Sequence, residues 1–493
     1  MRSNPRTQAP RARQMVALVG LALFTSSALG WAQEVSPEAT PTQVGESPQL
    51  PSGDSSPEVL PEEGELPGGD AMPAFPPGLD PGQVEAGDEA SEESGGTRWG
   101  LEAQLWLQRL YDRSPSEGGR TLPSNVGRLV LDFRREWQPG RRWTVGFSNQ
   151  WQGSLDLGRA EAVPSRSSAL NNVRELWVRW QPGDEARPLY LDVGRINIRN
   201  GVGSGYSPTD FFKVGAVRQP LSLDPNAFRL NRLGTVVAMV QYITEVGAWT
   251  AALVPPLSTQ DAMLEGEWYS LALNRTNNEA ALYAKWAPQI REWLSVDVLL
   301  LTRWNERPKF GLNMSLLLGS AVVVNMDWAV GGGRQLVGPD EPETPYNWCN
   351  RVAANLTWTT PLGLEVTLEQ QFASDALGAE AWRQWQGVND VRLQRLGEMS
   401  TRRSFELEPL LRYGSFARVG WRDAFAVRGL ELSSFVQVNN IDWSGLTQQM
   451  VVWHTQSDWS VGGQFQQFFG AANSEYGSLS TPSRFGLFVS RRN

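Results

Sequence analysis

The stretch that decides the fold is KFGLNMSLLLGSAVVVNMDWAV, Lys309 to Val330. Apolar residues alternate with small or polar residues from Phe310 to Leu318, and the alternation resumes at Val322 after a short Gly-Ser-Ala break. Because successive side chains of a β-strand point to opposite faces, this pattern predicts two antiparallel strands joined by a tight turn.

The same alternation recurs through residues 98–493, for example over Trp99–Leu107, Trp143–Phe147, Val352–Trp358 and Leu364–Leu368. The predicted strands run about 9–11 residues, which is the length that crosses a bilayer at a tilt and exceeds the usual ~5–6. Their polar faces carry small and hydrophilic side chains: Asn313, Ser315, Asn325, Asp327, Asn355, Thr357, Glu365, Thr367 and Glu369.

Tryptophan is abundant, with 22 residues, and many of them stand near predicted strand ends. Indoles concentrate at the lipid–water boundary, so this distribution is typical of the aromatic girdles of membrane barrels. Strands can cross lipid only as a closed barrel, because every backbone amide must be hydrogen-bonded there.

The sequence therefore predicts an all-β fold: a transmembrane antiparallel β-barrel of roughly 16–18 strands, with a long inward-folding loop and a disordered N-terminal segment. About twenty candidate strands can be marked, two of them starting near residues 267 and 406. A water-soluble sandwich would also alternate, but with its apolar face inward.

Two segments precede the barrel region. Residues 1–32 combine four arginines, the short apolar run Met15 to Phe24 and a small-residue exit, which predicts a secretory signal peptide cleaved after Ala32.

Residues 33–97 are rich in Asp, Glu, Pro, Gly and Ser and hold neither Lys nor Arg, which predicts a disordered periplasmic spacer. A docking tail for a basic partner or for peptidoglycan-associated machinery is the alternative. This segment accounts for the formal net charge of −9, so a nucleic-acid partner has no electrostatic support.

Catalytic and metal sites are not predicted, and neither is a cofactor. The chain has one cysteine, Cys349, and one histidine, His454, which excludes disulfide frameworks and Cys/His zinc sites. His454 shares a face with Val452 and is predicted to be lipid-facing or interfacial. Glu365 and Glu369 share a face, but residues four apart on a strand are ~13 Å apart, too far for a hydrolytic pair.

One loop interrupts the strand pattern: GRINIRNGVGSGYSPTDFFK, Gly194 to Lys213, within a connection far longer than the usual 2–6 residues. We predict that it folds inward as a pore constriction or gate, with a capped helical turn starting at Ser207; an exposed surface loop is the alternative. The constriction residues are Gly201, Gly203, Gly205, Ser207, Pro208, Asp210, Phe211 and Phe212. A second interruption, Ser374 to Arg403, has mixed helical spacing and is predicted to be an extracellular cap, a second plug or a mobile loop.

About twenty residues of this region resemble a segment of porin-like outer-membrane proteins of Gram-negative bacteria, in which a strand ending in Gly-Arg leads into a Gly-rich loop and an N/S-P-x-D turn. The matching residues are Gly194, Arg195, Gly201, Gly203, Ser207, Pro208, Asp210 and Phe211. The resemblance implies an outer-membrane channel with its N-terminal segment in the periplasm. The implied partners are membrane lipid, lipopolysaccharide and the barrel-insertion machinery, although the last strand ends in Arg-Arg-Asn rather than the usual aromatic residue.

The leading functional hypothesis is a channel for hydrophilic solutes, with a preference for anions set by lumen arginines: Arg195, Arg199, Arg218, Arg229 and Arg232. Those arginines could instead only pair with acids such as Asp210 and Asp224. The long strands and acidic spacer also resemble barrels that export exopolysaccharide, with sugar-stacking candidates Trp106, Trp177, Tyr190 and Tyr283. A structural or adhesin barrel and an outer-membrane hydrolase are weaker alternatives. The solute, the direction of transport and an oligomeric state stay open.

Overall fold

The computed structural model describes residues 98–114, 120–159, 165–182, 188–264, 268–304, 306–341, 347–386 and 390–492. The predicted signal peptide and acidic spacer lie outside these ranges. The strands are β1 (Arg98–Ser114), β2 (Arg120–Gly140), β3 (Trp143–Arg159), β4 (Ser168–Trp180), β5 (Leu189–Ile196), β6 (Thr235–Thr244), β7 (Gly247–Val254), β8 (Ala281–Arg291) and β9 (Leu294–Arg303). They continue as β10 (Lys309–Leu318), β11 (Val322–Gly333), β12 (Asn347–Thr359), β13 (Leu364–Ala373), β14 (Tyr413–Trp421), β15 (Leu430–Asn439), β16 (Gly445–His454), β17 (Trp459–Phe469) and β18 (Ser483–Arg492).

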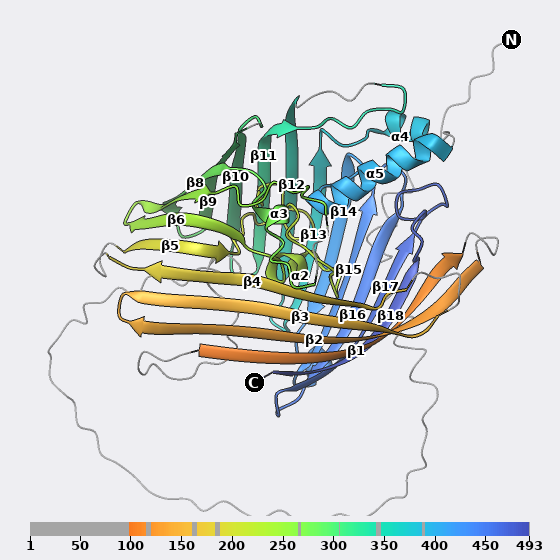
Figure 1. Ribbon diagram of the computed structural model, residues 1–493, viewed down its shortest axis with the longest axis horizontal. Helices are drawn as coiled ribbons and strands as arrows, with labels where there is room; N and C mark the ends of the chain where they lie inside the picture. The colour runs from red at the N-terminus through yellow and green to blue at the C-terminus, as the bar shows by residue number, and fades with distance from the viewer. Residues whose placement is uncertain are drawn as a thin grey trace, which may run out of the picture. The chain divides into compact units, whose positions relative to one another are not determined.

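These strands form one closed antiparallel barrel of 18 strands, each paired with its neighbours in the sequence (Figure 1). The ring closes where β1 pairs with both β2 and β18. The quoted hairpin forms as predicted, with Asn313 of β10 directly opposite Asp327 of β11. The predicted fold and strand range are therefore confirmed.

Two of the twenty marked strands are wrong. The region after residue 267 holds turns and the short helix α3 (Leu273–Thr276), and residue 406 ends the helix α5 (Asp390–Glu406). Both lie in long loops, where apolar residues pack against other loop residues and need not alternate.

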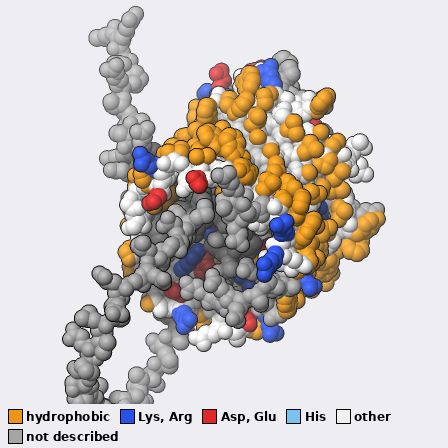
Figure 2. All heavy atoms as spheres, turned by 90° about the vertical axis from the view of Figure 1, so that its left-hand side faces the viewer, with side chains coloured by type: hydrophobic (Ala, Val, Ile, Leu, Met, Phe, Trp, Pro, Cys, Tyr) orange, Lys and Arg blue, Asp and Glu red, His pale blue; other side chains and the backbone are white. Residues whose placement is uncertain are grey.

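The burial pattern is the reverse of that in a water-soluble sandwich. On β10, β11 and β13 the polar alternates Asn313, Asp327 and Glu369 are at most 2% exposed. The apolar alternates Trp328 and Leu368 on the same strands are 39% and 56% exposed. Apolar side chains consequently form bands along the outer wall (Figure 2), and the polar faces point into the barrel.

The two ends of the barrel differ. At the end where β1 begins and β18 finishes, several connections are two to four residues long, for example residues 141–142, 245–246 and 360–363. A ring of exposed tryptophans marks this short-turn end: Trp99, Trp143, Trp180, Trp249, Trp286, Trp293, Trp358, Trp453 and Trp459. The opposite, long-loop end carries another exposed aromatic set: Trp268, Tyr269, Trp304, Trp348 and Tyr413. This arrangement is that of the predicted aromatic girdles.

Long loops at the second end hold the remaining helices. Residues 197–234, which we call the inward loop, contain α2 (Pro225–Leu230). Residues 374–412, which we call the cap loop, contain α4 (Ala379–Gln386) and α5. A 3-10 turn, η3 (Ala424–Ala426), lies between β14 and β15 at the short-turn end. None of the described helices is long and apolar enough to cross a membrane.

Part of the barrel interior is apolar, although the sequence predicted small and hydrophilic side chains on the inner faces of the strands. Inward side chains of β6 to β9 and β11 form a buried cluster with Phe211 and Phe212 of the inward loop. Its wall residues are Val237, Met239, Ala252, Val254, Ala281, Tyr283, Leu299, Leu301 and Ala329. The inner face can be apolar here because protein, and not water, covers it.

Candidate functional site

The inward loop is attached to the barrel wall through two carboxylates. Asp327 of β11 accepts hydrogen bonds from the backbone N–H groups of Val202 (2.9 Å) and Gly203 (3.0 Å). Glu369 of β13 accepts from the N–H groups of Ser204 (2.6 Å), Gly205 and Tyr206 (2.9 Å). Strands β11 and β13 lie on the far side of the ring from β5, from which the loop emerges. The loop thus crosses the barrel interior.

Two of the glycines are required by this close approach. Gly201 has a positive φ of 83°, and a Cβ there would overlap the Ser207 hydroxyl. A Cβ at Gly205 would lie 2.5 Å from the ring of Phe416 on β14. The glycines therefore let the backbone reach the wall carboxylates.

The predicted helical turn at Ser207 is wrong. The chain makes two successive turns between Pro208 and Phe212. The hydroxyl of Ser207 donates to Asp327 (2.8 Å) instead of capping a helix. The helix of this loop is α2, which Asp224 caps by accepting from the N–H of Asn226 (2.9 Å).

Most of the predicted lumen arginines hold the inward loop in shape. Arg232 makes a bidentate ion pair with Asp210, at 2.7 and 3.0 Å. Arg229 donates to three carbonyl groups of the loop, and Arg195 of β5 donates to two carbonyl groups of neighbouring loops. Arg218 donates to the side-chain oxygen of Asn172 on β4 (3.1 Å). The alternative that these arginines only pair with acids therefore holds for Arg232. Arg229 and Arg195 donate to backbone carbonyl oxygens instead.

A buried ionic cluster joins the inward loop to the cap loop and to β12. Glu408 lies 3.1 Å from both Lys213 and Arg351, and Asp375 lies 2.7 Å from Arg351 and 2.9 Å from Arg403. Burial alone would raise the pKa of Glu408, but the charges of Arg351 and Lys213 outweigh it and hold that pKa below its ordinary value. Sequence reasoning missed this cluster because its members are far apart in the chain.

The aromatic pair of the predicted constriction faces the apolar wall. Phe211 and Phe212 are buried, and the ring of Phe212 meets Tyr283 of β8 edge-on at 5.2 Å. The hydroxyl of Tyr283 donates to Asn200 (2.8 Å). The inward loop consequently fills the side of the barrel formed by β6 to β11.

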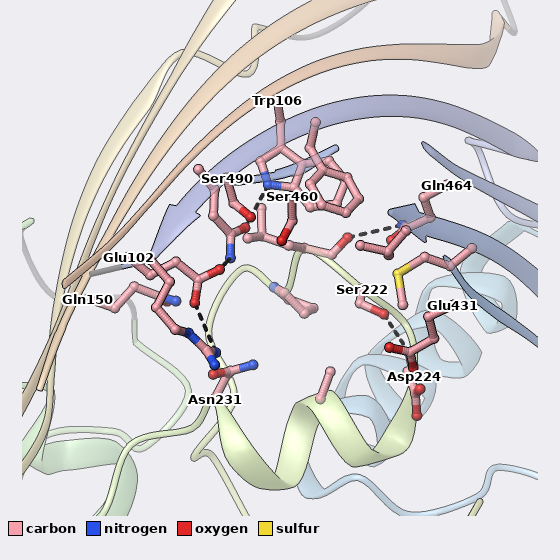
Figure 3. A pocket seen from close by; sticks show the side chains of 18 of the residues that line it. Glu102, Trp106, Gln150, Ser222, Asp224, Asn231, Glu431, Ser460, Gln464 and Ser490 are labelled. Carbon is pink, nitrogen blue, oxygen red and sulfur yellow. Dashed lines mark hydrogen bonds and ion pairs between the residues drawn. The ribbon is translucent and has the colours of Figure 1, made fainter. Parts of the chain in front are cut away.

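The other side of the lumen holds a chamber of about 720 Å³ near the short-turn end. Strands β1, β3 and β15 to β18 form one wall of the chamber, and residues 217–231 of the inward loop form the other (Figure 3). His454 lines this chamber, with Nδ1 2.8 Å from the Ser460 hydroxyl. Of the two alternatives predicted for His454, the lipid-facing one is wrong, because its neighbour Val452 belongs to an inward cluster with Trp106.

Two lumen-face arginines outside the predicted set keep a buried nitrogen atom without a partner and, unlike Arg174 and Arg418, have no ion pair among the described residues. They are Arg128 of β2 and Arg484 of β18, whose Nε atoms are both buried. The nearby Arg166 is satisfied by Asp112 (2.7 Å). The sequence signal that could have found Arg128 and Arg484 is their position on the inward face of alternating strands.

Comparison with known proteins gives structural similarity only. No family model matches the chain, and no curated protein matches it. The chain resembles the crystal structure of Pseudomonas aeruginosa OccK8 (OprE), at 9% identity over 80% of this chain and 98% of that chain, with a TM-score of 0.48. It resembles the crystal structure of OccK11 (OpdR) from the same organism at 10% identity, over 80% of this chain and 95% of that chain, with a TM-score of 0.44. It also resembles a BenF-like porin from Pseudomonas fluorescens Pf-5, at 8% identity, 80% and 98% coverage and a TM-score of 0.48. The fold assignment therefore rests on the strand pairing and burial of this chain.

Proposed function

We propose that the protein is an outer-membrane channel that passes small hydrophilic solutes, with a preference for anions, through a lumen narrowed by the Gly201–Lys213 segment. The observation that carries this proposal is the inverted burial of a closed barrel: apolar side chains face outward and polar side chains face inward. Only a lipid surround makes that arrangement favourable, because lipid contacts the apolar wall while water fills the polar lumen.

The orientation follows from the two ends. In bacterial barrels the short turns face the periplasm and the long loops face outside. The short-turn end would then face the periplasm and would be joined there to the acidic spacer of residues 33–97, after removal of the signal peptide 1–32. Membrane lipid, lipopolysaccharide and the barrel-insertion machinery are the expected partners of the apolar wall.

The preference for anions is assigned to arginines other than those predicted. Arg195, Arg229 and Arg232 are occupied by the loop itself, whereas Arg128 and Arg484 offer buried guanidinium nitrogens without acceptors among the described residues. The charges of Arg128 and Arg484 act on each other across the wall, and together they would favour an anion in the lumen.

Aromatic residues give no separate support to polysaccharide export among the described residues. Trp106 stacks on Phe488 with ring centroids 4.3 Å apart, and Tyr283 packs against Phe212. Tyr283 is covered by the inward loop, and the stacked pair of Trp106 and Phe488 lines one chamber and not a continuous path for a polymer.

The test is a planar-bilayer recording of the purified protein in a salt gradient. We expect discrete ohmic steps and a reversal potential on the anion-selective side. The double variant Arg128→Gln/Arg484→Gln should move the reversal potential toward zero. Arg135→Gln, on the outward face of the same β2 strand, is the matched control and should leave it unchanged. A silent bilayer would overturn the channel, and an unchanged reversal potential in the double variant would overturn the role of these arginines.

A further inference from the structure

The chamber has an apolar floor. Trp106 of β1, Val452 of β16 and Phe488 of β18 form a buried cluster that Leu221 and Met450 extend. All five residues line the chamber. Apolar surface in contact with water is unfavourable, so this floor favours a solute that has an apolar face of its own.

Gln464 of β17 adds a second requirement: the solute must carry a hydrogen-bond donor, because this side chain offers an acceptor without a partner among the described residues. Its side-chain Nε2 donates to the carbonyl oxygen of Leu221 (3.2 Å), which fixes the orientation of the amide. Its Oε1 is buried and has no partner among the described residues, although the side chain lines the chamber and is 4% exposed. A buried acceptor without a donor costs free energy, which a ligand hydroxyl would recover.

The rest of the lining is suited to an uncharged solute. Two of the chamber carboxylates already have cationic neighbours: Glu102 with Arg492 (3.5 Å) and Asp224 with Arg418 (3.4 Å). A third, Glu431, lies 3.5 Å from Nε2 of His454. Between them lie neutral hydrogen-bonding side chains on both walls, namely Gln104, Gln150, Ser222, Asn231, Ser460 and Ser490 (Figure 3).

From this combination we infer that the chamber is a binding site for hydroxylated ring compounds of monosaccharide size. One ring face lies on the floor of Trp106, Val452 and Phe488, and a ring hydroxyl donates to Oε1 of Gln464. A volume of about 720 Å³ lies within the range of small-molecule sites. The inference rests on the proposed channel function and adds a solute class and a site to it.

The experiment uses D-glucose as the probe on the full-length purified channel in a planar bilayer. We expect a saturable reduction of the ion current at glucose concentrations up to about 0.1 M, as for a weak millimolar site. Cyclohexanol, a ring of the same size with one hydroxyl, should reduce the current much less. Equal effects of the two compounds, or no effect of glucose, would overturn the inference.

Two variants locate the site. Gln464→Leu removes the free acceptor and should raise the half-blocking glucose concentration about two- to tenfold, the loss of one hydrogen bond. Gln466→Leu is the matched control: Gln466 lies two residues along on the same inward face, is equally buried and donates to Gln448 (2.8 Å), but does not line the chamber. Phe488→Leu, which retains apolar bulk but removes the flat ring, should also weaken the block.

Conductance in salt alone separates the two proposals. If the Gln464→Leu channel conducts normally but glucose blocks it as in the parent protein, the site is wrong and the channel stands. If the parent protein does not conduct, the proposed function fails first.

Discussion

At the scale of single residues, Asp327 and Glu369 bind the inward loop to the opposite wall of the barrel. Together they accept hydrogen bonds from five consecutive backbone N–H groups, those of residues 202–206. The alternation of the strands predicted both carboxylates as inward-facing. Their partners could not be predicted, because nothing in a strand pattern says which loop returns to which wall.

Removal of one of these carboxylates should loosen the loop. Asp327→Ala leaves two N–H groups and the Ser207 hydroxyl without their acceptor, at a cost of about 1–3 kcal/mol for each buried group that water does not reach. We expect a larger and noisier single-channel conductance in planar bilayers. Asp297→Ala is the control, since Asp297 pairs with Lys285 (2.9 Å) on the wall and makes no bond to the loop. A quiet, unchanged conductance in Asp327→Ala would mean that the loop does not limit the current.

At the scale of elements, the loops at the long-loop end are joined by buried polar contacts, and one of them involves a carboxyl group, that of Glu475, whose protonation depends on pH. In the β17–β18 loop, burial raises the pKa of Glu475 to about 7, and the nearby charge of Asp442 adds to the effect. Asn439 opposes it by donating to Glu475 (2.7 Å). Glu475 is thus protonated in the folded loop at a pH where an unfolded glutamate, with a pKa of about 4.3, is ionised.

The sign of the pH dependence follows. Between about pH 4.3 and about pH 7 the folded loop retains a proton that the unfolded loop releases, so the loop loses stability as the pH rises through this range. We expect faster hydrogen exchange of residues 470–482 at pH 8 than at pH 5, after correction for the intrinsic rate. Glu475→Gln, which stays neutral, should remove the difference. The same pH dependence in Glu475→Gln would assign it to another group.

At the scale of the whole molecule, the outward apolar surface determines the environment in which the barrel is stable. Leu368 lies in the interior of β13 and is 56% exposed, on the face opposite to Glu369. In the proposed membrane setting, its surroundings are lipid.

A charged side chain at position 368 should destabilise the folded barrel in lipid. Leu368→Arg is expected to lower the free energy of unfolding by about 2–4 kcal/mol in lipid vesicles, the cost of an arginine near the bilayer midplane. Leu257→Arg, at an exposed position in the β7–β8 loop, should have little effect. Denaturant unfolding of the refolded protein measures both. Equal stabilities of the two variants would contradict a lipid-facing wall.

The sequence by itself determined the architecture. Period-two alternation, strand length and tryptophan placement predicted an antiparallel barrel of 16–18 strands, and the structure has 18. These properties are local, because a strand that separates lipid from water must show the same two-faced pattern wherever it lies in the ring.

Only the tertiary structure decided how the interior is used. The inner faces of β6 to β9 are apolar where Phe211 and Phe212 cover them, and Arg229 and Arg232 are engaged by the loop while Arg128 and Arg484 are not. His454 lines the chamber and does not face lipid. Each of these outcomes depends on contacts between residues far apart in the chain, and inside a barrel such contacts are set by where the long loops return, which no local pattern encodes.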